Sequence, residues 1–314
     1  MSWNPTQDPG CPEVSGIAAI ETLIIPRTRD LGGFEVRRAL PAPERQMVGP
    51  FIFFDQMGPA EFLTGGGIDV RPHPHIGLAT VTYLYSGAFH HRDSTGADQI
   101  VYPGEVNWMI AGNGVTHSER TSEEMRRRPG TAFGIQTWVA LPDHVEDTAA
   151  SFEHHGRDAL PFLEDDGKQV RLILGSAWGA QAPAKTFTET FYADVVLAAG
   201  AKLPLPDDHE DRAAYVIEGS IVVAGASFSA GQMMVFRSGD RISVTGGERG
   251  ARLMVLGGET MNGPRYISWN FVASSQEKID AAKEAWRRGD WEHGRFHLPA
   301  GDQAEFISMP DSRK

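Results

Sequence analysis

The chain has 314 residues, of which 41% are hydrophobic and 22% are charged, with a formal net charge of −12. This length suits one large domain or two ordinary ones. The acidic balance argues against a general electrostatic grip on nucleic acid or anionic lipid, because such binding needs clustered lysine and arginine. The one dense basic run, residues 126–128, follows two glutamates and is interpreted as a solvated loop. We therefore expect no direct nucleic-acid partner and no membrane partner.

The N-terminal segment carries no sign of export. Cys11 is the single cysteine, so no internal disulfide can form, which fits a reducing compartment. No stretch approaches the length needed to span a membrane, and residues 1–5 lack the charged start and apolar core of a signal peptide. A cytoplasmic protein is expected.

The first half of the chain contains many short strand-like segments. The 35 glycines and 20 prolines of the whole chain are spread along the sequence, which is typical of strands joined by turns. From about Ile20 to Leu141, the clearest strands are expected at residues 80–85, 106–110 and 134–139. Alternation with period 2 sends one set of side chains inward and the other outward. Closely spaced strands of this kind predict a barrel or a sandwich.

Strand signals return in the second half, after a polar and acidic stretch at residues 142–166 that is interpreted as a linker. The expected strands lie at residues 170–174, 193–197, 214–217, 220–223, 233–236 and 253–256. The order of events repeats that of the first half. A strand ends near Gly87 and near Gly219, and the turn at residues 102–106 corresponds to residues 229–233. This suggests an internal duplication, with domains at residues 1–141 and 167–314.

One helix is expected near the end, over residues 275–288. Residues 274–277 form a capping box, in which a serine hydroxyl and a glutamate carboxylate satisfy free N–H groups of the first turn. Gly289 is a suitable C-terminal stop. Ile279, Ala282 and Trp286 share one face, so the helix is expected to pack against a barrel.

Two pairs of side chains point to metal chemistry. His73 and His75 are two residues apart, so both rings lie on one face of an extended chain. His117 and Glu119 repeat this spacing in a second strand-like region. A lone His-X-His is more often a pair of surface histidines, and the second pair is what favours a metal site. Three neutral nitrogens and one carboxylate suit Fe, Mn, Ni, Cu or Zn.

These segments resemble the two metal motifs of the cupin superfamily in the form found in pirins. The resemblance rests on residues 67–75, 80–84, 102–109 and 111–119, with pirin-like flanks at 49–55 and 136–142. It implies an all-β fold of two tandem cupin-type (jelly-roll) barrels with the C-terminal helix, the second barrel being metal-free. It implies one divalent metal, Fe(II), bound by the four residues of the two pairs, with Mn, Ni, Cu and Zn left open. Pirins commonly have Glu where this chain has Ala79, so a role near the metal could be changed.

The resemblance also implies an activity. Bacterial-type pirins are associated with quercetin 2,3-dioxygenase activity, so a flavonol-like aromatic substrate is expected, with Glu119 able to act as a base toward its proton. The alternative is a non-enzymatic, iron- and redox-dependent regulator that binds a protein partner. Five side chains could line a pocket above the metal, although core packing is the more common role: Phe53, Phe54, Trp108, Met109 and Trp138. The remaining histidines of polar segments are interpreted as solvated: His90, His91, His144, His154 and His155.

Overall fold

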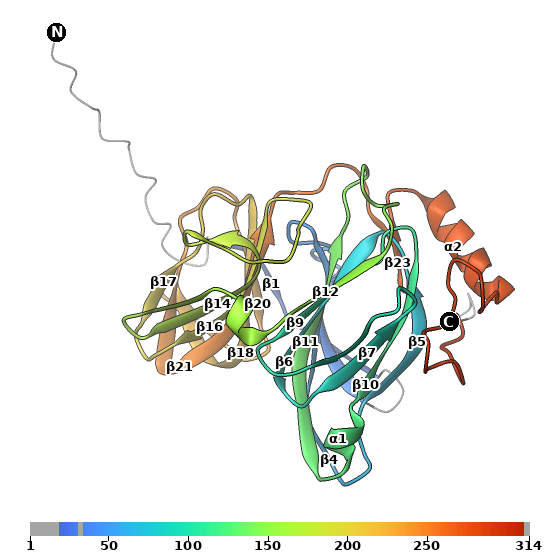
Figure 1. Ribbon diagram of the computed structural model, residues 1–314. Helices are drawn as coiled ribbons and strands as arrows, with labels where there is room; N and C mark the ends of the chain where they lie inside the picture. Colours follow the sequence, from blue (N-terminus) through green and yellow to red (C-terminus); the bar gives the residue numbers. More distant parts are fainter. Residues whose placement is uncertain (1–18, 31–33, 311–314) are drawn as a thin grey trace.

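The computed structural model describes residues 19–30 and 34–310, so Cys11 and residues 1–5 lie outside the described ranges. Two β-barrels lie side by side, and a C-terminal helix lies at the far side of the first barrel (Figure 1). The predicted all-β fold of two tandem barrels with a C-terminal helix is confirmed. No helix in the described ranges has the length and apolar character needed to cross a membrane.

The first barrel is built from two sheets. The seven-stranded sheet has the order β12 (Ser151–His155), β9 (Val106–Ile110), β6 (Leu78–Ser86), β11 (Gly130–Ala140), β4 (Phe51–Phe62), β3 (Glu35–Leu40) and β2 (Arg27–Asp30). The four-stranded sheet has the order β5 (Asp69–His75), β10 (Val115–Thr121), β7 (Phe89–Asp93) and β8 (Asp98–Val101). A short helix, α1 (Glu123–Arg126), connects β10 to β11. The candidate metal ligands all lie on β5 and β10 of the smaller sheet.

The second barrel is a ten-stranded sheet. Its main path is β1 (Ile20–Ile24), β20 (Met233–Phe236), β18 (Asp211–Val223), β21 (Ser243–Gly258), β16 (Thr190–Leu197), β14 (Lys168–Ala177) and β13 (Phe162–Asp165). Three short strands pair off this path: β15 (Ala180–Gln181), β17 (Lys202–Pro204) and β19 (Ala226–Ser229). The two strands predicted at residues 214–217 and 220–223 form one long strand, β18, with register shifts inside it.

The internal duplication is visible in the backbone. The N–H of Gly104 donates to the carbonyl of Leu84 at 3.0 Å, and the N–H of Gly231 donates to Val216 at 2.8 Å. Both glycines have a left-handed backbone, with φ of 82° and 83°. Such a φ favours glycine. The same turn is therefore built at the same place in each barrel.

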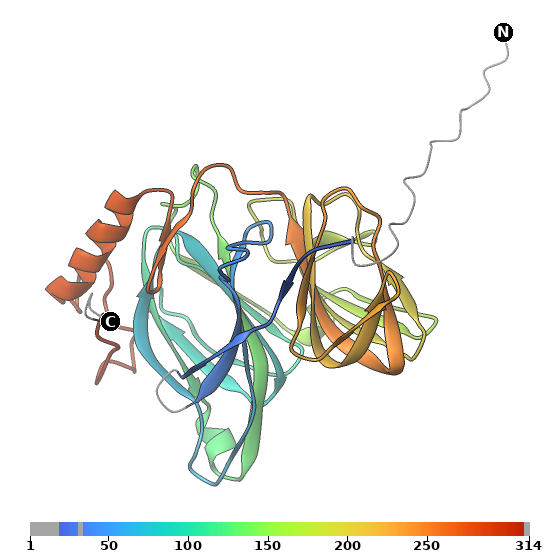
Figure 2. The same cartoon turned by 180° about the vertical axis from the view of Figure 1, so that it is seen from behind.

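The ends of the chain do not follow the predicted domain boundaries. β1 pairs with β20 of the second barrel, and the blue N-terminal segment then passes to the first barrel (Figure 2). After β21 the chain returns to the first barrel, where Ile76 and Phe271 form a parallel bridge. Residues 142–166, predicted as a linker, include β12, which pairs with β9 of the first barrel. β1 and β12 each cover a strand that would otherwise present unpaired N–H and C=O groups at the sheet edge.

The helix α2 (Gln276–Arg288) matches the predicted range. The predicted capping box at residues 274–277 is displaced by one residue, because the cap is Ser275, whose hydroxyl accepts from the N–H of Lys278. Ser274 donates instead to the buried Glu146. The predicted face of Ile279, Ala282 and Trp286 is buried, against β22 (Tyr266–Ser268), β23 (Phe271–Ala273) and side chains that include Ile76 of the first barrel. The helix therefore packs beside the first barrel, although it follows the second in the sequence.

The two barrels share one hydrophobic core, and polar contacts cross it. Tyr83 donates to Asp194 at 2.9 Å, and Tyr215 donates to Gln56 at 2.7 Å. Buried polar groups with partners like these fix how two elements pack. The second barrel thus supports the back of the sheet whose front faces the metal ligands.

Candidate metal centre

Three imidazoles converge inside the first barrel. In the antiparallel pair of β5 and β10, His73 lies opposite His117, and His75 lies one inward-facing position further along. The ring centroids are 4.4 Å apart for His73 and His117, 5.0 Å for His75 and His117, and 4.9 Å for His73 and His75. One nitrogen from each ring lies within 4.8 Å of the others. The predicted His-X-His therefore meets the second pair in space.

Backbone carbonyls fix the protons of two of these rings. His73 Nδ1 lies 2.8 Å from the carbonyl of Arg71, and His75 Nδ1 lies 2.9 Å from the carbonyl of Asn270. A carbonyl oxygen only accepts, so each neutral ring carries its proton on Nδ1 and has its lone pair on Nε2. His75 Nε2 lies 3.1 Å from His117 Nε2. Two nitrogens at this separation can bind one ion about 2 Å from each.

The carboxylate of Glu119 lies beside this cluster and is 6% exposed. Its Oε1 accepts from the hydroxyl of Thr82 at 2.6 Å, which links β10 to β6 across the barrel. Thr82 Oγ1 also lies 2.9 Å from the side-chain amide of Gln136. The atom placed there is Oε1, and because a hydroxyl has one proton, Thr82 can donate to Glu119 and accept from Gln136 only when the amide is turned to present its nitrogen. Glu119 is therefore held in place by a chain of two hydrogen bonds.

Burial determines the charge of the cluster. It lowers the pKa of His73 to about 4 and lowers those of His75 and His117 further below the usual range. It raises the pKa of Glu119, against the opposing effect of the Thr82 hydroxyl. Neutral nitrogens beside one carboxylate are a donor set that suits a divalent transition metal. The residues present therefore fit the ion that the sequence predicts.

These shifts predict how the metal-free protein responds to acid. Between pH 6.5 and about 4, unfolded histidine binds a proton and folded His73 does not, so the free energy of unfolding falls as the pH falls. His73 alone contributes roughly 3 kcal/mol to this loss, and Glu119 acts in the opposite direction. Urea denaturation at pH 7 and pH 4 measures the effect, which is expected to be smaller in His73→Asn. A difference as large in His73→Asn as in the wild type would contradict the assignment.

His91 also reaches this cluster, and its prediction as a solvated residue is wrong. In β7, Phe89, His91 and Asp93 are buried while His90 and Arg92 point outward. His91 is 2% exposed, and its Nδ1 lies 3.4 Å from His117 Nδ1. The sequence signal for this burial is that His91 lies two residues after the apolar Phe89, so both side chains face the same side of the strand.

The other histidines of the polar segments are closer to the prediction. His90 pairs with the exposed Asp98. His144 is exposed. His154 and His155 are partly buried on β12, where they contact Asn107 and Glu153. None of these four is within the groups of converging ligand atoms found in the described residues.

A cleft of about 380 Å³ opens onto His73, His75 and Glu119. Phe53 stacks on Trp138 with ring centroids 4.0 Å apart, and the rings of Trp138 and His75 lie edge to face with centroids 5.0 Å apart. The guanidinium of Arg38 lies 4.4 Å above the Phe53 ring. Of the five predicted pocket residues, Phe53 and Trp138 line the cleft, and the other three belong to the core: Phe54, Trp108 and Met109.

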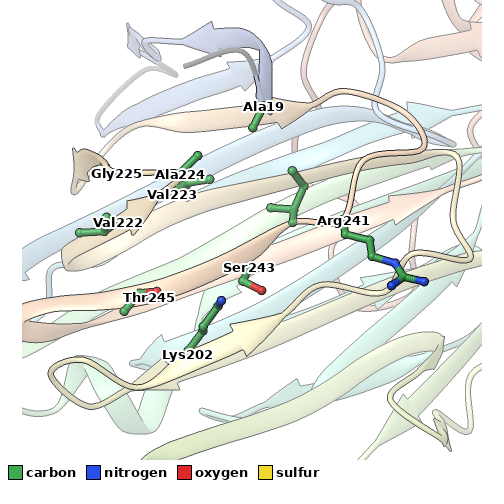
Figure 3. Close-up of a pocket in the computed structure, with 10 residues that line it drawn as sticks. Ala19, Lys202, Val222, Val223, Ala224, Gly225, Arg241, Ser243 and Thr245 are labelled. Carbon is green, nitrogen blue, oxygen red and sulfur yellow. The ribbon is translucent and has the colours of Figure 1, made fainter. Parts of the chain in front are cut away.

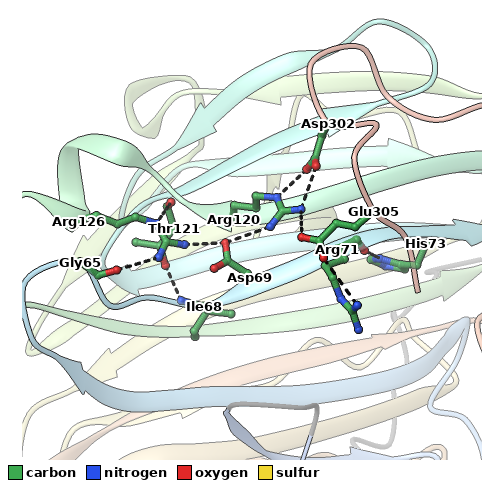
Figure 4. Close-up of polar contacts among 10 residues, drawn as sticks. All are labelled: Gly65, Ile68, Asp69, Arg71, His73, Arg120, Thr121, Arg126, Asp302 and Glu305. Carbon is green, nitrogen blue, oxygen red and sulfur yellow. Dashed lines mark hydrogen bonds and ion pairs between the residues drawn. The ribbon is translucent and has the colours of Figure 1, made fainter. Parts of the chain in front are cut away.

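The rim of the cleft includes residues from the end of the chain. Trp269 and Ile307 line it, and the N–H of Ile307 donates to the carbonyl of Pro72 at 2.8 Å. Arg120 of β10 binds both carboxylate oxygens of Asp302, at 2.7 and 2.9 Å (Figure 4). This C-terminal segment (residues 293–310) is therefore fastened beside the ligand strands.

The basic run at residues 126–128 is only partly solvated. Arg126 binds Asp69 at 2.6 Å and donates to the carbonyls of Gly65 and Thr121 (Figure 4). The interpretation as a solvated loop is wrong for Arg126, which ties α1 to the start of β5. Arg127 and Arg128 are exposed, as predicted.

Ala79 does not face the metal ligands. In β6, Thr82 contacts Glu119, and the period of 2 sends Ala79 and Val81 to the opposite side. Ala79 is fully buried there, next to Ile110 and Val139 of the adjacent strands. It belongs to the core between the two barrels. The change from the common pirin Glu therefore alters the core between the barrels.

The substitution Ala79→Glu separates an effect on the core between the barrels from an effect on the metal ligands. A carboxylate placed among apolar side chains without a partner is expected to lower the free energy of unfolding by at least about 3 kcal/mol. Metal affinity of the folded protein is expected to stay within a few-fold, since the side chain points away from the ligands. Denaturant unfolding and metal titration measure the two quantities. Val196→Glu, at an exposed strand position, is the control, and a large loss of metal affinity in Ala79→Glu would contradict the placement.

A cavity of about 220 Å³ in the second barrel has a different lining (Figure 3). Lys202, Arg241, Ser243 and Thr245 supply its polar atoms, and its lining residues include no histidine and no carboxylate. Within residues 19–30 and 34–310, both groups of three converging His, Cys, Asp or Glu side chains lie in the first barrel. The donors of a transition-metal site are therefore gathered in the first barrel of the described chain.

Comparisons with known proteins agree with this architecture. A family model described as Pirin matches residues 33–139, and one described as Pirin C-terminal cupin domain matches residues 192–292. A pirin-like protein of Caulobacter vibrioides is 45% identical over 295 residues, which are 93% of this chain and 100% of the relative.

Solved structures show the same fold. The crystal structure of a quercetin 2,3-dioxygenase from Acinetobacter baumannii has a TM-score of 0.82 at 31% identity, covering 93% of this chain and 97% of that chain. A bacterial pirin from Escherichia coli in complex with nickel(II) has a TM-score of 0.60 at 18% identity, covering 76% of this chain and 99% of that chain. The family models and the relatives span both barrels, and we conclude that this chain belongs to the pirin family.

Proposed function

We propose that the protein binds one divalent transition metal, Fe(II), on His73, His75, His117 and Glu119, and that it is an iron-dependent dioxygenase of flavonol-type substrates. The observation that carries this proposal is the convergence of the His73, His75 and His117 rings beside an aromatic cleft, with the buried carboxylate of Glu119 close to His117 in a second group that includes His91. The similarity to a structure named quercetin 2,3-dioxygenase supports the reaction. The nickel complex of an Escherichia coli pirin supports metal binding by the fold.

The cleft suits a planar aromatic ligand. Its volume of about 380 Å³ lies within the range of small-molecule sites. Phe53 and Trp138 form a stacked wall, and Trp269 lies on the rim. Arg38, which Asp55 holds with two hydrogen bonds of 2.9 and 2.8 Å, places positive charge over this wall. A polyphenol can stack on the rings while its oxygens face the ligands.

Proton transfer is assigned to Glu119. A bound metal supplies open coordination positions and lowers the pKa of a substrate hydroxyl. Glu119 Oε1 is engaged by Thr82, which leaves Oε2 available to accept the proton of that hydroxyl. Thr82 and Gln136 keep the carboxylate oriented during this transfer. The three rings are at most 7% exposed, so little bulk water reaches them.

Anaerobic reconstitution with Fe(II), followed by addition of quercetin and dioxygen, tests the proposal. The expected result is loss of the flavonol absorbance with release of carbon monoxide, absent in His73→Ala and in Glu119→Ala. His144→Ala, which changes an exposed histidine, is the control and should behave as the wild type. Mn, Ni, Cu and Zn forms prepared in the same way compare the alternative ions.

The negative outcome is equally informative. A loaded and folded protein that turns over no flavonol and no catechol would contradict the dioxygenase. That result would favour the alternative, an iron- and redox-dependent regulator that binds a protein partner.

A further inference from the structure

We infer that Arg38 selects substrates that carry a carboxylate at the end opposite the metal, so the substrate class is a planar aromatic acid. The inference rests on the proposed function and deepens it, because it concerns which aromatic ligand the cleft accepts. Arg38 lines the cleft together with Asp55 and Gln136, and its side chain is 25% exposed.

Asp55 occupies one edge of the Arg38 guanidinium. Nε donates to Asp55 Oδ1 at 2.9 Å, and Nη2 donates to Oδ2 at 2.8 Å. Asp55 is 2% exposed, so this two-point contact is sheltered from water and fixes the plane of the guanidinium. Cζ of Arg38 also lies 4.4 Å from the centroid of the Phe53 ring. Arg38 is therefore oriented before any ligand binds.

The outer edge of the guanidinium is available to a ligand. Arginine has five N–H groups, and Asp55 accepts from two of them. The other three, on Nη1 and Nη2, donate to no other residue within residues 19–30 and 34–310. Because the guanidinium is rigid, one N–H of Nη1 and one of Nη2 point in parallel along this edge. That spacing matches the two oxygens of a carboxylate.

The strand register places Arg38 and the metal ligands at opposite ends of one polar row. Arg38 of β3 lies opposite Asp55 of β4, which lies opposite Gln136 of β11. Gln136 lies opposite Thr82 of β6, whose hydroxyl donates to Glu119 at 2.6 Å. A ligand that binds the metal through two oxygens can therefore extend along this row and end at Arg38.

The length of this row sets the length of the ligand. The Arg38 guanidinium lies over Phe53 of β4, which is two strands from Thr82 of β6. Two strand spacings, about 10 Å, fit a single ring with chelating oxygens at one end and a carboxylate on a short chain at the other. Phe53 and Trp138 supply the surface on which that ring stacks.

The carboxylates that line the cleft do not oppose an anionic ligand, because each has a cationic partner. Asp55 is bound by Arg38, and Asp69 is bound by Arg126 at 2.6 Å. Glu119 is a ligand of the proposed divalent ion, whose charge exceeds that of one carboxylate. The acidic net charge of the chain is therefore not expressed in the cleft.

Two further arginines add positive charge at the rim. Arg29 is exposed on β2 opposite Val36, which lines the cleft, so both side chains leave the sheet on the same side. Arg71 is half-exposed on the rim, 3.7 Å from Glu305 (Figure 4). Exposed cations around a cleft favour the entry of an anion.

Binding of a matched acid and ester tests the inference. The probes are 3,4-dihydroxycinnamate and its methyl ester, which keeps the catechol and the ring but removes the charge. Calorimetric titration of the Ni(II)-loaded protein without dioxygen measures binding in the absence of turnover. The wild type is expected to bind the acid roughly 10- to 100-fold more tightly than the ester, because the ester loses charge-assisted hydrogen bonds to Arg38.

Arg38→Gln removes the outer edge and is expected to bring this acid-to-ester ratio close to one. A merely structural role of Arg38 would weaken binding of both probes alike and leave the ratio unchanged, which would overturn the inference. Arg37→Gln is the matched control, because Arg37 is the exposed neighbour on the opposite face of β3. It should keep the wild-type ratio.

Arg38→Lys keeps the test decisive if Arg38→Gln does not fold once Asp55 has lost its partner. The lysine ammonium can hold Asp55, but it has no second edge with parallel N–H groups. Its acid-to-ester ratio is therefore also expected to lie near one. A wild-type ratio in this variant, or a ratio near one in the wild type itself, would contradict the assignment of Arg38.

The same titration of the metal-free protein separates this inference from the proposed function. Both probes are expected to bind more weakly without the ion, with the acid-to-ester ratio unchanged, since the contact with Arg38 does not involve the metal. An acid preference that depends on Arg38, in a protein whose Fe(II) form turns over no flavonol and no catechol, would contradict the proposed function alone. Turnover of quercetin without any acid preference would overturn the inference alone.

Discussion

Replacing His75 with alanine is expected to reduce bound metal from about one equivalent per chain to background. His75 is 1% exposed, its Nδ1 proton is bound to Asn270, and its Nε2 lies 3.1 Å from that of His117. Loss of an outer partner costs 10- to 100-fold in affinity, and loss of a ligand is expected to cost more. Metal analysis after reconstitution and gel filtration measures the result.

Thermal unfolding gives an independent reading of the same variant. A metal that binds the folded state alone stabilises it by about 2.7 kcal/mol when present at 100 times its Kd. The wild type is expected to show this rise with added Fe(II) or Ni(II), and His75→Ala is not. His90→Ala, at an outward position of β7, should respond as the wild type. Equal metal-dependent stabilisation in His75→Ala would show that the ion binds elsewhere.

A large effect on stability is expected at the junction of the barrels, in Asp194→Ala. Asp194 is 6% exposed, receives two hydrogen bonds from Arg252 at 2.9 and 2.6 Å, and accepts from Tyr83 of the first barrel at 2.9 Å. Its loss leaves a guanidinium and a buried hydroxyl without this partner. Removing one member of a buried ion pair costs 3–5 kcal/mol, and the partial exposure of Arg252 places the expected loss near 3 kcal/mol.

The control for this prediction is an exposed ion pair of the same barrel. Arg241 and Asp207 lie 3.5 Å apart with both side chains more than half exposed. Asp207→Ala is therefore expected to change the free energy of unfolding by less than about 0.5 kcal/mol. Urea denaturation of both variants decides the comparison, and a loss in Asp194→Ala no larger than in Asp207→Ala would contradict the role given to the junction.

Local patterns predicted the strands and the ligand pairs because both depend on near neighbours. The mostly apolar run of residues 106–110 after the turn at residues 102–105 predicts β9, and the spacing of His73 with His75 places both rings on one face. The helix α2 was predicted for the same reason, since its apolar face and Gly289 stop are local signals, although its cap is Ser275 and not the predicted Ser274. Features that depend only on residues within one strand or one helix could therefore be predicted from the sequence.

Contacts between distant segments were not predictable in this way. Nothing near Ile20 indicates that β1 pairs with β20 more than 200 residues later, and nothing in Asp302 indicates Arg120 as its partner. Adjacent His90 and His91 were given one interpretation, although neighbouring residues of a strand face opposite sides. The effect of having alanine at position 79 could not be predicted without the second barrel, because the neighbours of Ala79 lie in the core that both barrels share.

Anomalous diffraction at the iron edge, from crystals grown with Fe(II), tests the metal site most directly. We expect one peak per chain in the first barrel, about 2.0–2.2 Å from the Nε2 atoms of His73, His75 and His117 and close to the carboxylate of Glu119. The absence of a peak from a loaded and folded protein, or a peak that lies away from these three rings, would contradict the account.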